Sequence, residues 1–303
     1  MAQLQKRGTR RQQRIESVLQ YIEAHNGESV DVSALASMAS ISPFHFHRVF
    51  SAQVGEPVLA YIRRLRLEKA AYRILFMDNN VTEAAALAGY SSAAAFTRAF
   101  RQHFGTTPKK FVRKLLECRP RDQSQNTGMP SGPVYRRMAP LNLLGVKRLG
   151  AYDRAPWEAW SVLRAYLRSI ADEGKEWTRI GLPLDWPELT PEPRRRYEAC
   201  VVSDAAPEGE FFRKQLAGGT HAIFLHRGPY QELQAAHEKI FWNWLPGAEV
   251  QLRDAPAFHI YTASPDGRAG TGSLITEICI PVEMPQVSRS VFQIQQSLAQ
   301  AEW

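Results

Sequence analysis

The spacing of apolar residues predicts that the first third of the chain is helical. Between residues 11 and 116, apolar side chains recur every three or four positions, as they do along the buried face of an amphipathic helix. One such stripe runs from Ile15 to Ile22 and ends near Gly27. Residues 58–76 keep this spacing and contain neither glycine nor proline. They are therefore predicted to form one long helix.

Within this helical region one short pattern occurs twice, fifty positions apart. Each copy has a helix of small residues, a tight turn, a serine at the start of a second helix, and a closing glycine. A shift of fifty superimposes Leu35-Ala36 and Ala85-Ala86, Ala39 and Gly89, Ser42 and Ser92, Phe46 and Phe96, Arg48 and Arg98, Phe50 and Phe100, Val54 and Phe104, and Gly55 and Gly105. The repeat predicts two helix-turn-helix units in tandem, held at a fixed separation by the long helix.

Short polar residues stand at the start of the first helix of each copy. Asp31 or Ser33 in the first copy, and Thr82 in the second, can accept hydrogen bonds from the free N–H groups of a first helical turn. We therefore expect these side chains to cap the two helices.

The second half of the chain has a different pattern of apolar and polar residues. Residues 118–133 are polar and rich in proline, glycine and serine, which is typical of a linker. Amphipathic helical stretches at 157–170 and 231–244 interrupt β-prone runs at 134–138, 143–149, 197–202, 222–226, 258–261 and 274–282. This order, a strand, a helix and strands, and then the same again, predicts a duplicated α+β unit with an antiparallel sheet.

The expected fold is therefore a two-domain protein with an all-α N-terminal domain and an α+β C-terminal domain that carries an internal pseudo-duplication. Its expected parts are a tandem helix-turn-helix DNA-binding domain at 1–117, a linker at 118–133, the α+β domain at 134–285 and a tail at 286–303.

Charge supports a nucleic-acid partner for the first domain. The net charge is +8, but residues 1–120 hold 18 Lys and Arg against 9 Asp and Glu, whereas the remainder holds 20 against 21. The basic character lies in the segment with the repeat, as a phosphate-binding surface requires. We expect double-stranded DNA as the partner.

Other classes of function find little support. The three cysteines, Cys118, Cys200 and Cys279, are widely spaced and form no metal-binding motif, which favours a reducing cytoplasm. We see no nucleophile elbow, metal-ligand cluster or phosphate loop, and no apolar run suited to a signal peptide or a membrane span. The expectation is a cytoplasmic protein without catalytic residues, metal or cofactor, and not an enzyme.

The second helix of each repeat has an outward face. In the second copy, Phe96, Phe100 and Phe104 recur every four residues and would bury one face. The residues that would then point outward are Phe44, His45, His47 and Arg48 in the first copy, and Ala93, Ala94 and Arg98 in the second. His45 and His47 diverge on a helix because they are two positions apart, so we do not expect a metal pair.

Residues 10–115 resemble the DNA-binding domain of AraC/XylS-type regulators. The resemblance is carried by VGEPVLAYIRRLRLEKAAYRIL and VTEAAALAGYSSAAAFTRAFRQHFGTTPKKFVR, with turn glycine, phenylalanines, arginine and closing Gly-x-x-Pro together. It implies a transcriptional regulator, more specifically an activator that contacts RNA polymerase. It also implies that bases are contacted by Phe44, His47, Arg48, Ala93, Ala94 and Arg98.

The chemistry of these positions differs between the two copies. Arg48 and Arg98 can each reach the O6/N7 edge of a guanine, worth ~1–3 kcal/mol of discrimination, although a phosphate contact is the alternative for both. Ala93 and Ala94 form no side-chain hydrogen bonds, which predicts weaker or shape-based reading in the second half-site. Contacts with the phosphate backbone of DNA are expected from Lys109, Lys110, Arg113 and Lys114. Two units on one rigid connector could bind a non-palindromic site as a monomer.

The second half resembles a GyrI-like effector-binding domain. The resemblance rests on FLHRGPYQELQAAHEKIFWNWLPG and TEICIPV, and the order of the two domains is similar to that of Rob-type activators. It implies two pseudo-symmetric halves around an aromatic pocket, often with a buried carboxylate, and a small aromatic or cationic effector. His259 stands where the family commonly has glutamate, which weakens the case for a cationic ligand.

The candidate carboxylate is Glu277, which lies inside an apolar strand where an unpaired charge is unfavourable. Its alternation with Ile278 and Ile280 also allows an exposed position or a structural hydrogen bond. The candidate pocket walls are Tyr197, Tyr261, Trp157, Trp160 and Trp242, each of which could equally belong to the core. Two other functions stay open: an architectural DNA-binding protein without effector, and a GyrI-like hydrolase fused to a DNA-binding domain.

Overall fold

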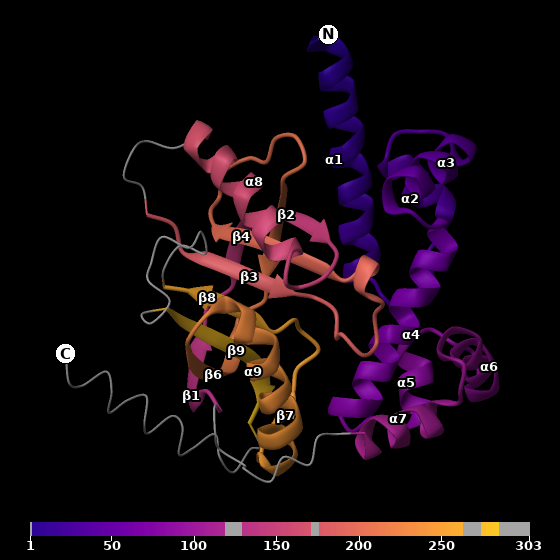
Figure 1. Ribbon diagram of the computed structural model, residues 1–303. Helices are drawn as coiled ribbons and strands as arrows, with labels where there is room; N and C mark the ends of the chain where they lie inside the picture. Colours follow the sequence, from indigo (N-terminus) through magenta and orange to yellow (C-terminus); the bar gives the residue numbers. More distant parts are fainter. Residues whose placement is uncertain (1, 119–128, 171–175, 263–273, 285–303) are drawn as a thin grey trace.

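The computed structural model describes residues 2–118, 129–170, 176–262 and 274–284, with side chains from residue 13 onward. The expected tail at 286–303 and most of the expected linker lie outside the described residues. Figure 1 shows an all-helical part packed beside a sheet that carries helices of its own. No described helix combines the length and the apolar character that crossing a bilayer needs.

Within the described residues 2–118, seven helices form the N-terminal domain. They are α1 (Ala2–Ala24), α2 (Val32–Met38), α3 (Pro43–Val54), α4 (Val58–Phe76), α5 (Val81–Leu87), α6 (Ala93–Phe104) and α7 (Pro108–Glu117). The pairs α2–α3 and α5–α6 are the two expected helix-turn-helix units, and α4 has the predicted bounds. Figure 1 shows α3 and α6 near opposite ends of α4, on the side away from the sheet.

The ends of the second helices follow from local hydrogen bonds. Ser42 accepts a hydrogen bond from the backbone N–H of His45, and Ser92 accepts one from Ala95. Each helix ends at a glycine in the left-handed region, Gly55 at φ 82° and Gly105 at φ 74°, where other residues are strained.

The first helices follow the expected capping in one copy only. The side chain of Asp31 accepts from the N–H of Ser33 at 2.8 Å. In the second copy the expectation of Thr82 is wrong: the side chain of Asn80 accepts from the N–H groups of Thr82 and Glu83, and the Glu83 carboxylate accepts from Asn80 N–H. This reciprocal capping box begins the helix at position 81 and leaves Thr82 inside its first turn.

The offset of fifty sequence positions between the two units holds only for their second helices, which begin at Pro43 and Ala93. The first helices, which begin at Val32 and Val81, are related by forty-nine. The loop between the two helices of each unit contains one residue with positive φ, Ser40 (54°) in the first unit and Gly89 (77°) in the second. These two residues are also forty-nine positions apart. The turn of the second unit is therefore one residue longer, which the uniform shift of the sequence did not reveal.

The C-terminal domain is an antiparallel sheet with helices α8 (Ala155–Ile170) and α9 (Leu233–Lys239), the latter continuing as the π-helical turn Ile240–Trp244. Its strands are β1 (Ser131–Met138), β2 (Leu141–Leu149), β3 (Arg179–Pro183), β4 (Arg196–Val202), β5 (Phe212–Leu216), β6 (Gly219–Arg227), β7 (Gln251–Leu252), β8 (Phe258–Tyr261) and β9 (Ile275–Glu283). The order is β1-β6-β9-β8-β3-β4-β2-β5, and β7 pairs with β9.

The strand order confirms the predicted duplication. The half β5-β2-β4-β3 has the same arrangement as the half β1-β6-β9-β8, with α8 after β2 and α9 after β6. The halves meet where β3 pairs with β8, at Ile180 opposite Ile260. Three strands were not predicted, namely β3, β5 and β7. β1 begins at Ser131, inside the range expected to be linker.

The two domains pack directly against each other. Phe76, at the end of α4, belongs to the main core cluster of the C-terminal domain. Its ring centroid lies 4.8 Å from that of Trp186, 5.1 Å from Phe241 and 4.9 Å from Trp242. Ion pairs between the domains include Lys147–Glu16, Lys147–Glu23, Arg196–Glu23, Arg194–Glu56, Lys69–Asp254 and Arg73–Asp254.

Candidate nucleic-acid interface and ligand cavity

The outward face of α3 is exposed in the region where the repeat places it. Phe44 is 83% exposed, and His47 and Arg48 are exposed as well. The guanidinium Nη2 of Arg48 lies 3.2 Å from Nδ1 of His45 on the same helix. The opposite face packs through the fully buried Phe46 and Phe50, so the outward residues are held on a rigid support.

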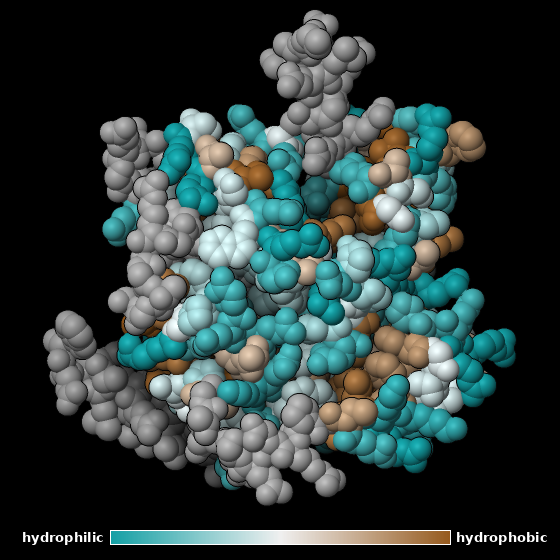
Figure 2. All heavy atoms as spheres, viewed as in Figure 1, coloured by the Kyte–Doolittle hydropathy of each residue, from teal (hydrophilic) through white to brown (hydrophobic). Residues whose placement is uncertain are grey.

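The outward face of α6 is also exposed. Ala94 and Arg98 are exposed and Ala93 is half-buried, while Lys109 and Lys110 are exposed at the start of α7. Hydrophilic side chains line the outer edge of the helical domain in Figure 2.

Sequence reasoning did not include two further residues of this face. Arg101 and Gln102 are exposed on α6, one turn beyond Arg98. Their helical spacing from Arg98 is a signal that could have identified them.

The connector helix sets the distance between the two faces. α4 has nineteen residues, which span about 28 Å at the usual helical rise. Successive major grooves on one side of B-DNA are about 34 Å apart. The length of α4 is thus of the same order as the spacing of successive major grooves.

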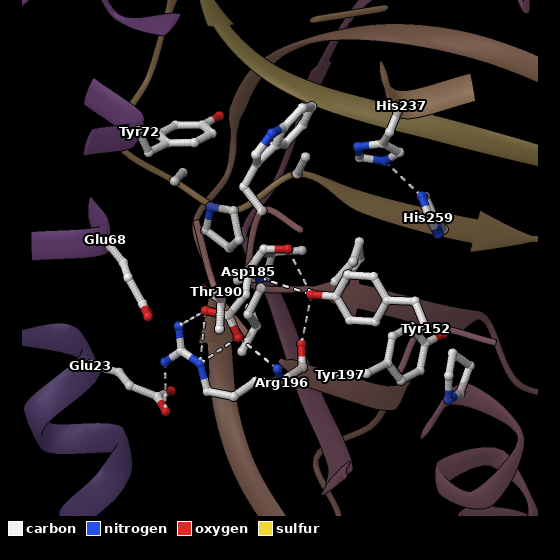
Figure 3. A pocket seen from close by; sticks show the side chains of 18 of the residues that line it. Glu23, Glu68, Tyr72, Tyr152, Asp185, Thr190, Arg196, Tyr197, His237 and His259 are labelled. Atoms are coloured by element: carbon white, nitrogen blue, oxygen red, sulfur yellow. Dashed lines mark hydrogen bonds and ion pairs between the residues drawn. The ribbon is translucent and has the colours of Figure 1, made fainter. Parts of the chain in front are cut away.

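A cavity of about 1000 Å³ lies where the two domains meet. Its walls include α1 and α4 on one side, and α8, α9, the start of β4, β5, β8 and the segment after β3 on the other. Figure 3 shows Glu23, Glu68 and Tyr72 of the helical domain facing Asp185, Arg196, Tyr152 and His237 of the C-terminal domain.

A chain of polar side chains, buried except for the half-buried His237, lies on the C-terminal side of this cavity. The indole Nε1 of Trp160 donates to the hydroxyl of Tyr197 at 3.0 Å, and the hydroxyls of Tyr197 and Tyr261 are 2.9 Å apart. The Tyr261 hydroxyl lies 3.3 Å from Nδ1 of His259, whose Nε2 lies 2.8 Å from Nε2 of His237.

This chain carries no net charge. A hydrogen bond between two imidazole nitrogens needs one N–H and one lone pair, so at most one of His237 and His259 can be protonated in it. Burial lowers the pKa of His237 to about 4 and lowers that of His259 well below its usual value. Both rings are therefore neutral near pH 7, and the polar end of the pocket offers neutral donors and acceptors.

Gly181 on β3 permits the close approach of the two tyrosines. A Cβ atom at this position would overlap the hydroxyl oxygens of Tyr197 and Tyr261. Its role arises from close packing, which no pattern of the sequence indicated.

The structure brings together four of the six expected pocket residues. Tyr197, Tyr261, Trp157 and Trp160 all line the cavity, whereas Trp242 and Glu277 are absent from its lining. Trp242 instead packs against Phe76 and Trp186.

Glu277 lies on the other face of the sheet. Its neighbours on β9, Ile278 and Ile280, belong to the core cluster that contains the pocket tyrosines, and Cys279 belongs to the cluster on the opposite face. By the alternation of a strand, Glu277 shares the face of Cys279. There its carboxylate pairs with Arg136 at 3.2 Å, as in the structural alternative for this residue.

These features define a class of protein, a DNA-binding transcriptional regulator whose helix-turn-helix domain is packed on an α+β domain with a cavity. Comparison with known families agrees. The helix-turn-helix domain family matches residues 35–114, and the GyrI-like small molecule binding domain family matches residues 133–283. The chain belongs to the AraC-type helix-turn-helix transcriptional regulators and carries a GyrI-like domain.

Similar proteins include the probable transcription factor PqrA of Proteus vulgaris, 32% identical over 99 residues, which cover 32% of this chain and 81% of PqrA. The HTH-type transcriptional regulator YbfP of Bacillus subtilis is 33% identical over 110 residues, covering 34% of this chain and 37% of YbfP. Among solved structures, EcmrR in its DNA complex aligns with a TM-score of 0.44 at 13% identity, over 84% of this chain and 100% of EcmrR.

Proposed function

We propose that this protein is a sequence-specific transcriptional activator that reads two adjacent major-groove segments with α3 and α6. The observation that carries the proposal is the pair of exposed outward faces, supported by buried phenylalanines, near the two ends of one connector helix. On this basis the protein binds a non-palindromic DNA site as a monomer and activates transcription through contact with RNA polymerase. We further propose that the protein acts in the cytoplasm, as expected of a regulator that must reach DNA.

The proposed division of labour follows residue chemistry. The base-reading residues are Phe44, His47 and Arg48 on α3, and Ala93, Ala94 and Arg98 on α6. Lys109 and Lys110 then contact phosphates at the N-terminal end of α7, where the helix dipole also favours negative charge. Because the two alanines form no hydrogen bonds, the half-site under α6 depends more on Arg98 and on DNA shape.

The GyrI-like domain is proposed to bind a small aromatic effector in the cavity between the domains. Trp157, Trp160, Tyr197 and Tyr261 supply flat apolar surface there, and the neutral tyrosine–histidine chain supplies hydrogen bonds. Pockets of this kind, apolar with a few fixed polar groups, are typical of small-molecule sites.

Selection of bound duplexes from a random DNA pool tests the DNA-binding part of the proposal. We expect enriched sequences with two half-sites about one helical turn apart, bound by one protein per duplex in sedimentation measurements. Anisotropy titrations of the enriched and scrambled duplexes then give the specificity ratio. A ratio near one would instead indicate an architectural DNA-binding protein.

A further inference from the structure

One carboxylate of the helical domain is held in the cavity wall with one of its oxygens uncommitted. Glu68, on α4, is 6% exposed and lines the cavity. Its Oε2 accepts a hydrogen bond from Arg64 at 3.0 Å, whereas Oε1 has no hydrogen-bond partner among the described residues. Nε2 of His103 lies 3.8 Å from Oε1, and burial lowers the pKa of that histidine.

The other carboxylates of the cavity wall are either engaged or exposed. Glu23 is paired with Lys147 and Arg196, and Asp185 with Arg196 at 2.6 Å. Asp254 pairs with two basic residues of α4, Glu238 accepts from Gln234, and Asp153 is exposed. Glu68 is thus distinguished by an acceptor that is both buried and unused.

The surroundings of Glu68 make a donor at Oε1 favourable. Burial raises the pKa of its carboxyl to about 7, while Arg64 and a hydrogen bond from the side chain of Thr190 of the C-terminal domain act in the opposite direction. A buried carboxylate with an incomplete set of partners is stabilised by any further N–H donor, most of all by a charged one. The neutral histidines across the cavity provide no such charge.

We propose that the effector site extends onto the connector helix α4, where Oε1 of Glu68 accepts a hydrogen bond from a protonated nitrogen of the effector. The aromatic part of the effector lies against Tyr72 of α4 and the aromatic wall of the GyrI-like domain. This inference rests on the proposed effector role of the cavity and adds that the DNA-binding domain itself contributes to the ligand site.

The placement of Glu68 gives the effector a direct route to the recognition helices. Helix α4 contacts α3, α5, α6 and α7, so a ligand that shifts or stiffens α4 acts on both helix-turn-helix units at once. The signal does not have to pass along residues 118–133. By linkage, DNA then changes the affinity for the effector by the same factor as the effector changes the affinity for DNA.

Two isosteric probes test this on the full-length protein. 2-Naphthamidine is a flat aromatic cation with N–H donors, and 2-naphthamide is its neutral counterpart. By calorimetry we expect the wild type to prefer the amidine by about tenfold or more, as a charge-assisted hydrogen bond warrants. Glu68→Gln should remove this preference. The matched control is Glu56→Gln, because Glu56 binds the same Arg64 but does not line the cavity.

Four outcomes decide between the proposals. Loss of the preference in Glu68→Gln but not in Glu56→Gln supports the inference. A preference retained in Glu68→Gln, with binding of both probes weakened by Trp160→Ala, overturns the inference and leaves the effector cavity standing. The absence of saturable binding of either probe at millimolar concentration overturns both. If Glu68→Gln fails to fold, Tyr72→Leu serves as the test instead. It should lower the affinity for both probes, and an unchanged affinity overturns the extension of the site onto α4.

Discussion

One buried lysine contributes three ion pairs at the contact between the two domains, two of them across it. Lys147 on β2 is 8% exposed, and its Nζ lies 3.1 Å from Glu16 and 3.0 Å from Glu23, both on α1, and 3.5 Å from Glu198 of its own domain. Burial by itself lowers the pKa of Lys147, but the three carboxylates reverse this and raise it well above its usual value. The ammonium is therefore charged and holds α1 against the sheet.

We predict that Lys147→Met lowers the free energy of unfolding by about 3 kcal/mol, the lower end of the range for breaking a buried ion pair. The lower end applies because two of the three carboxylates still have an ion-pair partner after the substitution. Glu23 still pairs with Arg196 at 3.0 Å, and Glu198 still pairs with Lys214. Glu16 loses its ion pair with Lys147, but burial already raises the pKa of Glu16, so protonation limits the loss.

Urea unfolding measured in two ways tests this prediction. All seven tryptophans lie in the second half of the chain, so their fluorescence reports on the C-terminal domain, while far-UV circular dichroism is dominated by the helical domain. We expect the two transitions to coincide in the wild type and to separate in Lys147→Met.

The neighbouring residue supplies the control. Arg148→Met removes the partly exposed pair with Glu210 at 2.8 Å and should change stability by about 1 kcal/mol or less. If Lys147→Met loses no more stability than Arg148→Met, the lysine does not hold the domains together and the reasoning is refuted.

Three further predictions concern DNA, the pocket and pH. Arg98→Ala should weaken binding to the selected site by roughly 1–3 kcal/mol and relax discrimination at one base pair; an equal loss on scrambled duplexes would assign Arg98 to a phosphate. Gly181→Ala should force Tyr197 and Tyr261 apart, lower stability by about 1–3 kcal/mol and weaken naphthamide binding, and unchanged calorimetric affinity would contradict this role. Burial raises the pKa of Glu23, but Lys147 and Arg196 outweigh it and lower the pKa below the ordinary 4.5. This carboxylate therefore stabilises the fold above about pH 4.5, and the melting temperature should fall below that pH less steeply in Glu23→Gln, whereas parallel pH profiles would exclude the pairing.

Local patterns predicted the helical domain well because its elements depend on neighbours in the sequence. The bounds of α4, the glycine ends of α3 and α6 and the buried phenylalanine face all follow from helical spacing and capping. The errors were equally local. A uniform shift of fifty could not detect the extra residue in the loop between α5 and α6. Asn80 and Thr82 both have side chains that can cap a helix, and spacing alone did not show that α5 begins after Asn80.

The sheet was harder to predict because short strands carry little pattern. β5 lies at the edge, and its sequence FRKQL has three polar residues in its centre. β3 contains only five residues, with Gly181 in the middle. The position of Glu277 was open for a related reason: alternation places it on one face of a strand, but only the assembled sheet decides which face the cavity occupies.

By itself, the sequence determined two helix-turn-helix units, their outward residues and a duplicated α+β domain, since each of these follows from spacing within a few turns or strands. Only the tertiary structure decided how the domains meet. Phe76 enters an aromatic cluster with Trp186 and Phe241, and Lys147 binds Glu23 across 124 positions of sequence. Such contacts arise from complementary surfaces that are distant along the chain, and periodicity carries no information about them. The same packing places Glu68 in the wall of the cavity.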